Sequence, residues 1–373
     1  MLDKLPISLK TKKILDKALD EPISYEDANY LINVGGSDLF ALIATADYLR
    51  KEIVGNNVTF INNCNINFTN VCTVKCGFCA FARDLGDHDA YILTDEEILN
   101  KATRAVENGA REFCLMGGVL PDANIEYYED LLKLLKNEFP NVLIHGFSPT
   151  MIYDASLKSE MDVDDSLKVL KRAGLDTLPG TAAEILTNRS RDLICPSKVN
   201  VSKWIDIVKS AHNVGIPSSA TMMYGHVENI QERIEHLEIL RNIQLETKGF
   251  TEFIPMTFMY EYSPIYNSGG KNLGATGTED LKLYAVSRLM FRDLIPNIQV
   301  SWVKMGFKFA QISLTAGAND LGGTLGGDEL SEASGAPDGV DASIEQLSNI
   351  VKDLGRLPIE RNSKYTEFYP INY

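Results

Sequence analysis

The amino-acid sequence predicts an α/β fold, a (β/α)8 TIM-type barrel preceded by a helical extension over residues 1–55. From Val58 onward, short β-rich runs alternate with longer amphipathic runs, which is typical of a parallel sheet with covering helices. Eight such β-rich runs fit within the 373 residues, as a closed barrel requires. Several amphipathic runs end at a glycine, as at Gly109, Gly174 and Gly215, where a left-handed turn ends a helix at little cost. An open doubly wound sheet is the alternative architecture.

The expected elements follow the chain in order. Apolar residues at helical spacing predict helices within residues 9–18, 25–34 and 39–53, ahead of the barrel. The expected strands cover residues 58–62, 112–116, 142–147, 177–178, 220–224, 253–258, 298–302 and 318–321. The expected barrel helices cover residues 95–108, 125–137, 166–173, 201–213, 229–244, 278–292 and 311–315. Residues 56–373 are therefore expected to form one barrel domain with a C-terminal segment, and the glycine-rich stretches 268–277 and 322–339 to form loops at one barrel face.

Composition excludes several classes of function. The net charge is −15, from 36 lysines and arginines and 51 aspartates and glutamates, and no cluster of basic residues is found. We therefore expect neither nucleic acid nor an anionic membrane surface as a partner. No run approaches the roughly 18 to 20 apolar residues that span a bilayer, and no apolar run follows the N-terminal residues. A cytoplasmic protein acting on small molecules is expected.

The most specific motif is a cluster of cysteines directly after the first predicted strand. Cys72, Cys76 and Cys79 have the spacing C-x3-C-x2-C, with Phe78 before the last of them. Three thiolates on one short loop can hold three irons of a 4Fe-4S cluster, and the fourth iron is then open to a small chelating ligand. With this spacing, that ligand is expected to be S-adenosylmethionine (SAM).

Other interpretations of the cysteines stay open at this point. The three thiols could bind zinc together with a distant ligand such as His88, or could pack in the core. Zinc sites usually present two C-x2-C pairs, and this chain has one. The remaining cysteines, Cys64, Cys114 and Cys195, are expected to be small buried residues.

Polar residues and glycines follow several predicted strands, at the barrel end where active sites lie. Gly117 and Gly118 follow the second strand, where backbone can approach a ligand closely, although a plain turn would use the same residues. His145 ends the third strand. Glu184 begins a helix after the fourth and either caps that helix or contacts a ligand. Asn319 lies with Asp320 on the last strand, where an Asx-rich turn is the alternative.

Taken together, these segments resemble one family of the radical SAM superfamily, the tyrosine-dependent subunit of deazaflavin (FO) synthase. The matching stretches are residues 65–81, 178–186, 194–196, 221–228, 249–255, 297–299, 301–304 and 318–324. The resemblance covers nearly the whole chain from about residue 20. The cysteine motif alone indicates only the superfamily, and the later stretches narrow it to this family and its menaquinone-pathway relatives.

The resemblance implies a radical SAM barrel and a radical transferase mechanism. A 5'-deoxyadenosyl radical, formed from SAM at the reduced 4Fe-4S cluster, would take a hydrogen atom from L-tyrosine. The Cα–Cβ bond would break, and the 4-hydroxybenzyl group would be transferred to 5-amino-6-(D-ribitylamino)uracil. An electron donor such as ferredoxin or flavodoxin, and a separate ring-closing radical SAM subunit, are the implied partners.

The resemblance and the strand ends together give the candidate site residues. The cluster ligands would be Cys72, Cys76 and Cys79. The predicted SAM-binding residues are Phe78, Gly117, Gly118, Glu184, Met223 and Tyr224, although a methionine there is better suited to filling the barrel. The predicted substrate-binding residues are His145, Ser148, His226, Glu252, Tyr260, Asn319 and Asp320.

The chain also departs from the family's pattern at three places. Tyr260 stands where a histidine is expected, and Cys64 where an arginine is expected. Residues 326–329 read Gly-Gly-Asp-Glu in place of Met-Asn-Glu-Ser. A divergent radical SAM enzyme with another substrate, such as an aminofutalosine-type synthase or the ring-closing subunit, is therefore the first alternative. A non-catalytic iron–sulfur or zinc protein is the second.

Overall fold

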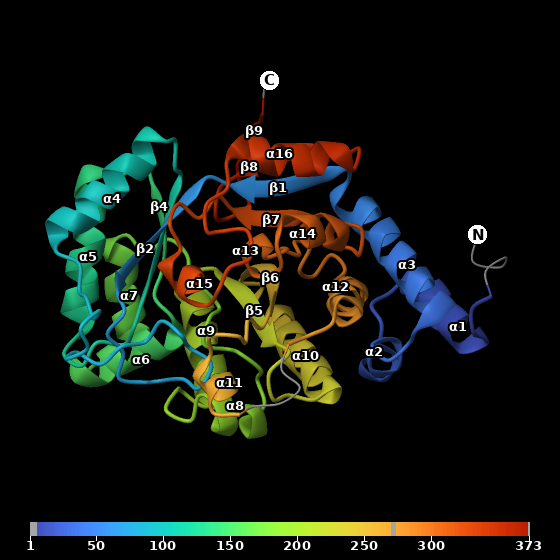
Figure 1. The fold of residues 1–373 in the computed structure, drawn as a ribbon, viewed down its shortest axis with the longest axis horizontal. Helices are drawn as coiled ribbons and strands as arrows, with labels where there is room; N and C mark the ends of the chain where they lie inside the picture. Colours follow the sequence, from blue (N-terminus) through green and yellow to red (C-terminus); the bar gives the residue numbers. More distant parts are fainter. Residues whose placement is uncertain (1–5, 270–273, 372–373) are drawn as a thin grey trace.

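The computed structural model describes residues 6–269 and 274–371, and its central element is a ring of parallel strands (Figure 1). The strands of the ring are β1 (Asn57–Ile61) continued by β2 (Asn63–Thr69), β3 (Glu112–Gly117), β4 (Leu143–Gly146), β5 (Ser218–Tyr224), β6 (Phe250–Thr257) and β7 (Asp320–Gly323). Parallel bridges at residues 177–178 and 298–299 supply the fourth and seventh positions. Because β7 pairs in parallel with β1, the eight positions close into the predicted barrel.

The first barrel strand is longer than predicted. β1 pairs with β7, and β2 pairs with β3, so one extended segment joins both neighbours. The prediction ended this strand at residue 62 because asparagines, which are depleted in strands, follow it. Here the side-chain amides are hydrogen-bonded to neighbouring segments: Asn62 Nδ2 donates to the Asn108 carbonyl, and Asn63 Nδ2 donates to Glu112. The cysteine loop therefore follows β2 rather than residues 58–62.

Two C-terminal strands were not predicted. β8 (Leu357–Arg361) pairs in parallel with β1, and β9 (Phe368–Pro370) runs antiparallel to β8. A proline and two charged residues within β8 hid the strand pattern in the sequence. This segment covers the end of the barrel at which the strands begin, where Arg361 Nε donates to Asp320 Oδ2 at 2.6 Å.

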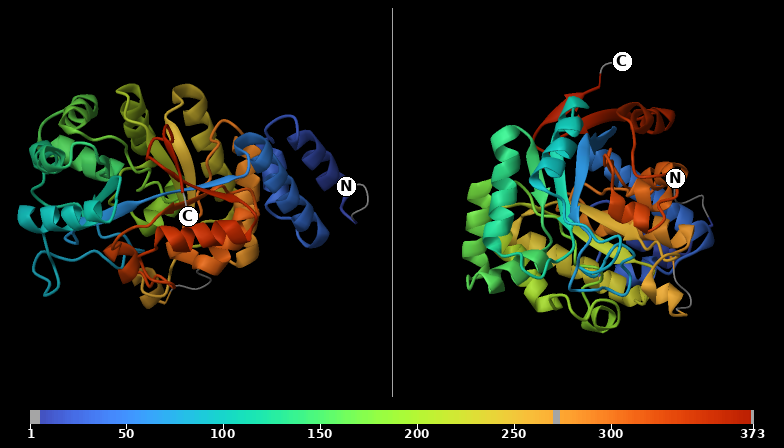
Figure 2. Two further views of the ribbon diagram at one scale, coloured as in Figure 1. Left: turned by 90° about the horizontal axis from the view of Figure 1, so that it is seen from above. Right: turned by 60° about the vertical axis from the view of Figure 1, so that its left-hand side comes forward.

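Helices surround the ring and form the N-terminal extension. The extension contains α1 (Leu9–Ala18), α2 (Tyr25–Leu31) and α3 (Gly36–Val54). The other helices are α4 (Asp95–Glu107), α5 (Ile125–Glu138), α6 (Pro149–Lys158), α7 (Val163–Ala173), α8 (Asn188–Ile194), α9 (Val201–Asn213), α10 (Ile230–Thr247), α11 (Pro264–Asn267), α12 (Gly277–Phe291), α13 (Trp302–Met305), α14 (Phe307–Leu314), α15 (Glu329–Ala333) and α16 (Ile344–Asp353). Figures 1 and 2 show α1–α3 at one end of the molecule and α4–α7 at the other.

Several local predictions are corrected by the structure. Residues 298–302 form a bridge and then the start of α13, not a full strand. The stretch 322–339 is only partly loop, because it contains the end of β7 and α15. The stretch 268–277 ends at the start of α12, and its residues 270–273 lie outside the described residues. The glycine stops are confirmed, since Gly109, Gly174 and Gly215 all have positive φ.

The extension packs directly against the barrel. Buried residues of α1 and α3, such as Leu15 and Leu42, belong to one apolar cluster with Leu289 of α12 and Phe253 of β6. The boundary at residue 55 stays a prediction, because the extension and the barrel share this core. None of the helices in the described residues is both long enough and apolar enough to span a membrane.

Candidate active site

A cavity of about 330 Å³ lies inside the barrel at the end where the strands finish. Residues from β2, β3, β4, β5 and β6 line it, together with the loops that follow them. The three cysteines of the C-x3-C-x2-C motif all line this cavity. Active sites of (β/α)8 enzymes lie at this end of the barrel, so the fold and the motif indicate the same location.

Backbone hydrogen bonds hold the cysteine loop against its neighbours. The Cys72 amide donates to the Arg83 carbonyl at 3.0 Å, and the Gly77 amide donates to the Ile194 carbonyl at 2.7 Å. Cys76 is buried, and burial raises its pKa to about 12. All three thiols are free of disulfides. Three soft sulfur donors on one fixed loop fit a 4Fe-4S cluster.

The zinc alternative lacks a suitable geometry. Within residues 6–269 and 274–371, no three His, Cys, Asp or Glu side chains converge as a single metal ion would require. His88, the suggested fourth ligand, has a side chain that is 96% exposed and does not line the cavity. A 4Fe-4S cluster spreads its thiolate ligands over separate irons and does not need that convergence.

The two glycines at the end of β3, Gly117 and Gly118, line the cavity, and Gly118 also makes room for the cysteine loop. A Cβ added at Gly118 would lie 2.0 Å from the Val71 carbonyl oxygen and 2.8 Å from Cys72 Cβ. At Gly117 it would lie 3.0 Å from the Phe68 ring. Glycine is therefore required at Gly118 by the close approach of the chain's own cluster loop, and the predicted contact with SAM stays a prediction.

Glu184 lines the cavity and forms an ion pair with Lys198, which the sequence analysis did not single out. Glu184 Oε1 accepts from Lys198 Nζ at 2.5 Å, and both side chains are largely buried. Burial alone would raise the pKa of Glu184, but Lys198 and then Arg191 outweigh it, so the pKa lies below its ordinary value. Lys198 Nζ also lies 5.0 Å from the ring centroid of Phe78. These residues join the cysteine loop to the loop after the fourth barrel position.

Three of the predicted binding residues, His145, Ser148 and Met223, line the cavity. His145 Nδ1 lies 2.7 Å from Thr177 Oγ1, and burial lowers the pKa of His145, which favours the neutral imidazole. Ser148 also caps α6, because its Oγ accepts from the Met151 amide at 3.3 Å. Their binding roles remain predictions, while their positions are compatible with those roles.

Three predicted residues near the cavity mouth have other contacts and do not line the cavity. The Tyr224 hydroxyl donates to Asp280 Oδ1 at 2.6 Å, on the outer side of the strand. His226 is buried, with Nε2 2.9 Å from the Met223 carbonyl oxygen. Tyr260 packs on Tyr266, with ring centroids 5.2 Å apart. The structure therefore places Tyr224, His226 and Tyr260 outside this cavity, and their predicted binding roles stay predictions.

Glu252, Asn319 and Asp320, which were predicted to bind substrate, lie near the beginning of barrel strands. Asp320 Oδ2 accepts from Thr59 Oγ1 and from Arg361, and Asn319 Oδ1 accepts from Arg288 at 2.8 Å. None of the three lines the cavity. These groups form a buried polar floor of the barrel, opposite the cysteines.

The floor gives a prediction for stability. Burial raises the pKa of Glu252 from 4.5 to about 7, against the opposing effect of Arg361. A carboxyl group whose pKa is raised on folding makes the protein less stable as pH rises from about 4.5 to 7, with no further change above. The shift corresponds to about 3 kcal/mol. Glu252→Gln should therefore unfold at a higher temperature than the wild type at pH 8 but not at pH 5, and equal differences at both pH values would contradict it.

The sequence analysis missed several polar residues of the cavity. Asn67 of β2 is 1% exposed, and neither its Nδ2 nor its Oδ1 has a hydrogen-bond partner among residues 6–269 and 274–371. Thr150 and Thr181 line the same cavity with buried, unpaired hydroxyls. Lys304 and Asp328 also line it. A strand with polar residues at every second position was the available signal for Asn67, whereas no local pattern indicates the others.

The fold and the site define a class, which comparison with known proteins confirms. The model of the radical SAM superfamily matches residues 66–240, and the model of the CofH/MqnC C-terminal region matches residues 247–372. Solved structures with the same fold include methylornithine synthase (TM-score 0.69, 20% identity, 94% of this chain and 97% of that one) and the hydrogenase maturase HydG (TM-score 0.72, 18% identity, 94% and 76%). At these identities, the structures show the fold alone.

Curated relatives narrow the class to one family. A 5-amino-6-(D-ribitylamino)uracil–L-tyrosine 4-hydroxyphenyl transferase of Methanothermobacter thermautotrophicus is 52% identical, over 97% of this chain and 98% of the relative. The enzyme of the same name from Methanocaldococcus jannaschii is 46% identical, over 88% and 92%. The chain belongs to this transferase family of the radical SAM superfamily, and the resemblance seen in the sequence is confirmed.

Proposed function

We propose that the protein breaks the Cα–Cβ bond of L-tyrosine and transfers the 4-hydroxybenzyl group to 5-amino-6-(D-ribitylamino)uracil, as a step in deazaflavin synthesis. The observation that carries the proposal is the match to transferases of this name over nearly the whole chain, at 46–52% identity. The barrel cavity supports it, because the motif cysteines and a set of polar side chains share that cavity.

Cys72, Cys76 and Cys79 would hold a 4Fe-4S cluster, and Gly117, Gly118, Phe78, Glu184 and Met223 are proposed to contact SAM. When bound, these cofactors supply the one-electron chemistry that starts the reaction. The chain's own residues bind and orient the substrates and keep water away. Polar side chains inside a closed barrel can hold both substrates while its apolar walls exclude water.

The unpaired amide of Asn67 supports a polar ligand in the cavity. A buried donor and acceptor without partners cost stability, so their retention favours a binding role. A side-chain amide offers one donor and one acceptor side by side, which complements the alternating N–H and C=O groups of a uracil ring. We propose that Asn67 contacts the uracil substrate.

Asn67→Leu should raise the stability of the substrate-free protein while lowering its activity. Removing the two unpaired groups is expected to stabilise by about 1–3 kcal/mol, and kcat/KM for the uracil should fall about tenfold or more. Thermal unfolding and initial rates measure the two effects. Asn70→Leu is the control, because Asn70 is paired with Asp89 and Tyr91 and its loss should destabilise. A stable Asn67→Leu variant with normal kcat/KM would contradict the proposal.

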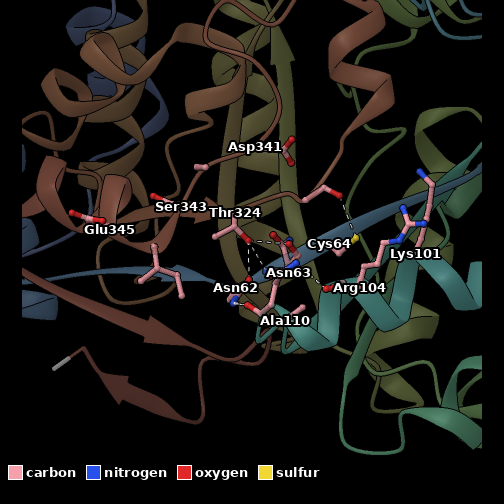
Figure 3. Close-up of a pocket in the computed structure, with 15 residues that line it drawn as sticks. Asn62, Asn63, Cys64, Lys101, Arg104, Ala110, Thr324, Asp341, Ser343 and Glu345 are labelled. Carbon is pink, nitrogen blue, oxygen red and sulfur yellow. Dashed lines mark hydrogen bonds between the residues drawn. The ribbon is translucent and has the colours of Figure 1, made fainter. Parts of the chain in front are cut away.

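Two of the three departures from the family's pattern, Tyr260 and Cys64, lie outside the cavity, which favours the same substrates, whereas the third includes Asp328, which lines the cavity. Tyr260 does not line the cavity. Cys64 Sγ lies 3.3 Å from the Gly326 carbonyl oxygen, and both residues line a separate outer pocket of about 830 Å³ between α4 and the C-terminal segment. Figure 3 shows Cys64, Lys101 and Asp341 around that pocket.

We further propose a cytoplasmic location, ferredoxin or flavodoxin as electron donor, and a separate radical SAM subunit that closes the deazaflavin ring. The six free cysteines are compatible with a reducing compartment. The chain has one cluster motif, which supports a separate subunit with its own cluster for the ring-closing step.

The proposed function is tested by incubating the reconstituted protein anaerobically with SAM, dithionite, tyrosine and the diaminouracil. We expect 5'-deoxyadenosine and 2-iminoacetate to form together and only when tyrosine is present. Deoxyadenosine without iminoacetate would show a radical SAM enzyme with another substrate, whereas zinc in place of iron after anaerobic purification would exclude the radical chemistry.

A further inference from the structure

A lysine and an aspartate of opposite charge face the cavity without contacting each other directly. Lys304 Nζ donates to Ser331 Oγ at 2.7 Å, and Ser331 Oγ donates to Asp328 Oδ2. All three side chains line the cavity, with Asp328 8% and Ser331 0% exposed. One buried hydroxyl therefore bridges a buried aspartate and a half-buried lysine.

The surrounding structure fixes both charges in place. Trp302 of α13 stacks on Phe307 at 4.5 Å between centroids, and its Nε1 donates to the Gly323 carbonyl at 2.9 Å. This anchors the short helix that carries Lys304. Asp328 precedes α15, and its Oδ1 accepts from the Ser331 amide at 3.4 Å. Lys304 therefore extends from α13, after the seventh barrel position, and Asp328 from the loop after the eighth.

The other lysine that lines the cavity, Lys198, belongs to a direct ion pair. Lys198 contacts Glu184 directly at 2.5 Å, so these two charges compensate each other. Lys304, in contrast, makes no ion pair within 4 Å in the described part of the chain, and its ammonium has three N–H donors of which the hydroxyl uses one. Asp328 likewise keeps free lone pairs. Both groups can bind further charged partners.

We propose that Lys304 binds the α-carboxylate and Asp328 the α-ammonium of the amino acid substrate. The proposal rests on the proposed function, in which that substrate is L-tyrosine. A free amino acid carries one positive and one negative group on the same carbon, so its recognition needs two opposite charges close together. Such charge-assisted hydrogen bonds in a water-poor cavity are strong and would fix Cα, whose bond to Cβ is broken.

The proposal is tested by equilibrium binding to the reconstituted protein with SAM and no reductant, so that no turnover occurs. The probes are L-tyrosine, tyramine, which lacks the carboxylate, and 3-(4-hydroxyphenyl)propionate, which lacks the ammonium. Lys304→Met should weaken tyrosine binding about 10- to 100-fold and leave tyramine binding unchanged. Asp328→Asn should weaken tyrosine by a similar factor and leave the propionate unchanged.

Lys308→Met is the control, because Lys308 is exposed on α14 and does not line the cavity; it should change no affinity. Circular dichroism and iron content check that each variant is folded and loaded. The proposal is overturned if either variant weakens the binding of all three probes equally, because Lys304, Ser331 and Asp328 would then only anchor α15. It is also overturned if neither variant weakens tyrosine binding.

The test also separates this inference from the proposed function. If the wild type binds another α-amino acid in place of tyrosine, with the same pattern across the variants, the roles of Lys304 and Asp328 are supported and tyrosine as the substrate is contradicted. If the wild type binds no α-amino acid, the charge pair is overturned as well.

Discussion

Replacing Gly118 with alanine is expected to abolish incorporation of the iron–sulfur cluster. The added Cβ would lie 2.0 Å from the Val71 carbonyl oxygen and 2.6 Å from its carbonyl carbon. Backbone, not the end of a flexible side chain, would have to move, and the backbone in question leads directly into Cys72. A strain of about 3 kcal/mol would shift the loop's equilibrium away from the cluster-competent conformation by more than about a hundredfold.

Iron and labile sulfide per chain after anaerobic reconstitution measure the effect. Gly86→Ala is a matched control, because nothing lies within 4 Å of a Cβ at Gly86 and its φ is not in the left-handed region. It should retain wild-type iron content. A Gly118→Ala protein with full iron content would show that the loop tolerates displacement and that this close approach does not position the cysteines.

Breaking the buried Lys198–Glu184 pair gives the second large effect. Lys198→Met should leave Glu184 as an uncompensated buried carboxylate and destabilise the protein by about 3–5 kcal/mol. The same change should raise the pKa of Glu184, because Lys198 is the main group that lowers it. Denaturant unfolding at pH 7.5 measures the loss. Activity should fall with it, since Lys198 and Glu184 both line the cavity.

Two further variants isolate the cause. The double variant Glu184→Gln, Lys198→Met should recover most of the lost stability, because no charge is then left unpaired. Lys209→Met removes an ion pair with Glu246 at the surface and should cost less than about 1 kcal/mol. A single Lys198→Met variant as stable as Lys209→Met would contradict the account of a buried compensating pair.

The fold class could be predicted because its signals are local. Alternation of strands and helices, glycine helix stops and the cysteine spacing each depend on a short stretch of chain, and the structure confirms the barrel. The strand β2 was missed because asparagines are typical turn residues, although here Asn62 and Asn63 bond to the end of α4 and to the adjacent strand β3. β8 was missed because its partner is β1, about 300 residues earlier in the chain.

The site could be predicted only where one segment supplies it. The cysteine loop and the glycines at the end of β3 line one cavity as expected, whereas Glu252 and Asp320 face the barrel floor. The sequence indicates that a strand is present, but not at which depth of the barrel each residue lies. Lys304 contacts Ser331, which contacts Asp328, so tertiary packing joins two distant segments in a way that no sequence periodicity encodes.

The most direct test of the central claim follows the two carbons of the broken bond. The reconstituted protein would be given SAM, reductant, the diaminouracil and tyrosine labelled with carbon-13 at either Cα or Cβ. The account predicts that the Cβ label appears in the uracil adduct and the Cα label in 2-iminoacetate or its hydrolysis product glyoxylate. An adduct that carries the Cα label, or 5'-deoxyadenosine formed with no labelled adduct, would contradict it.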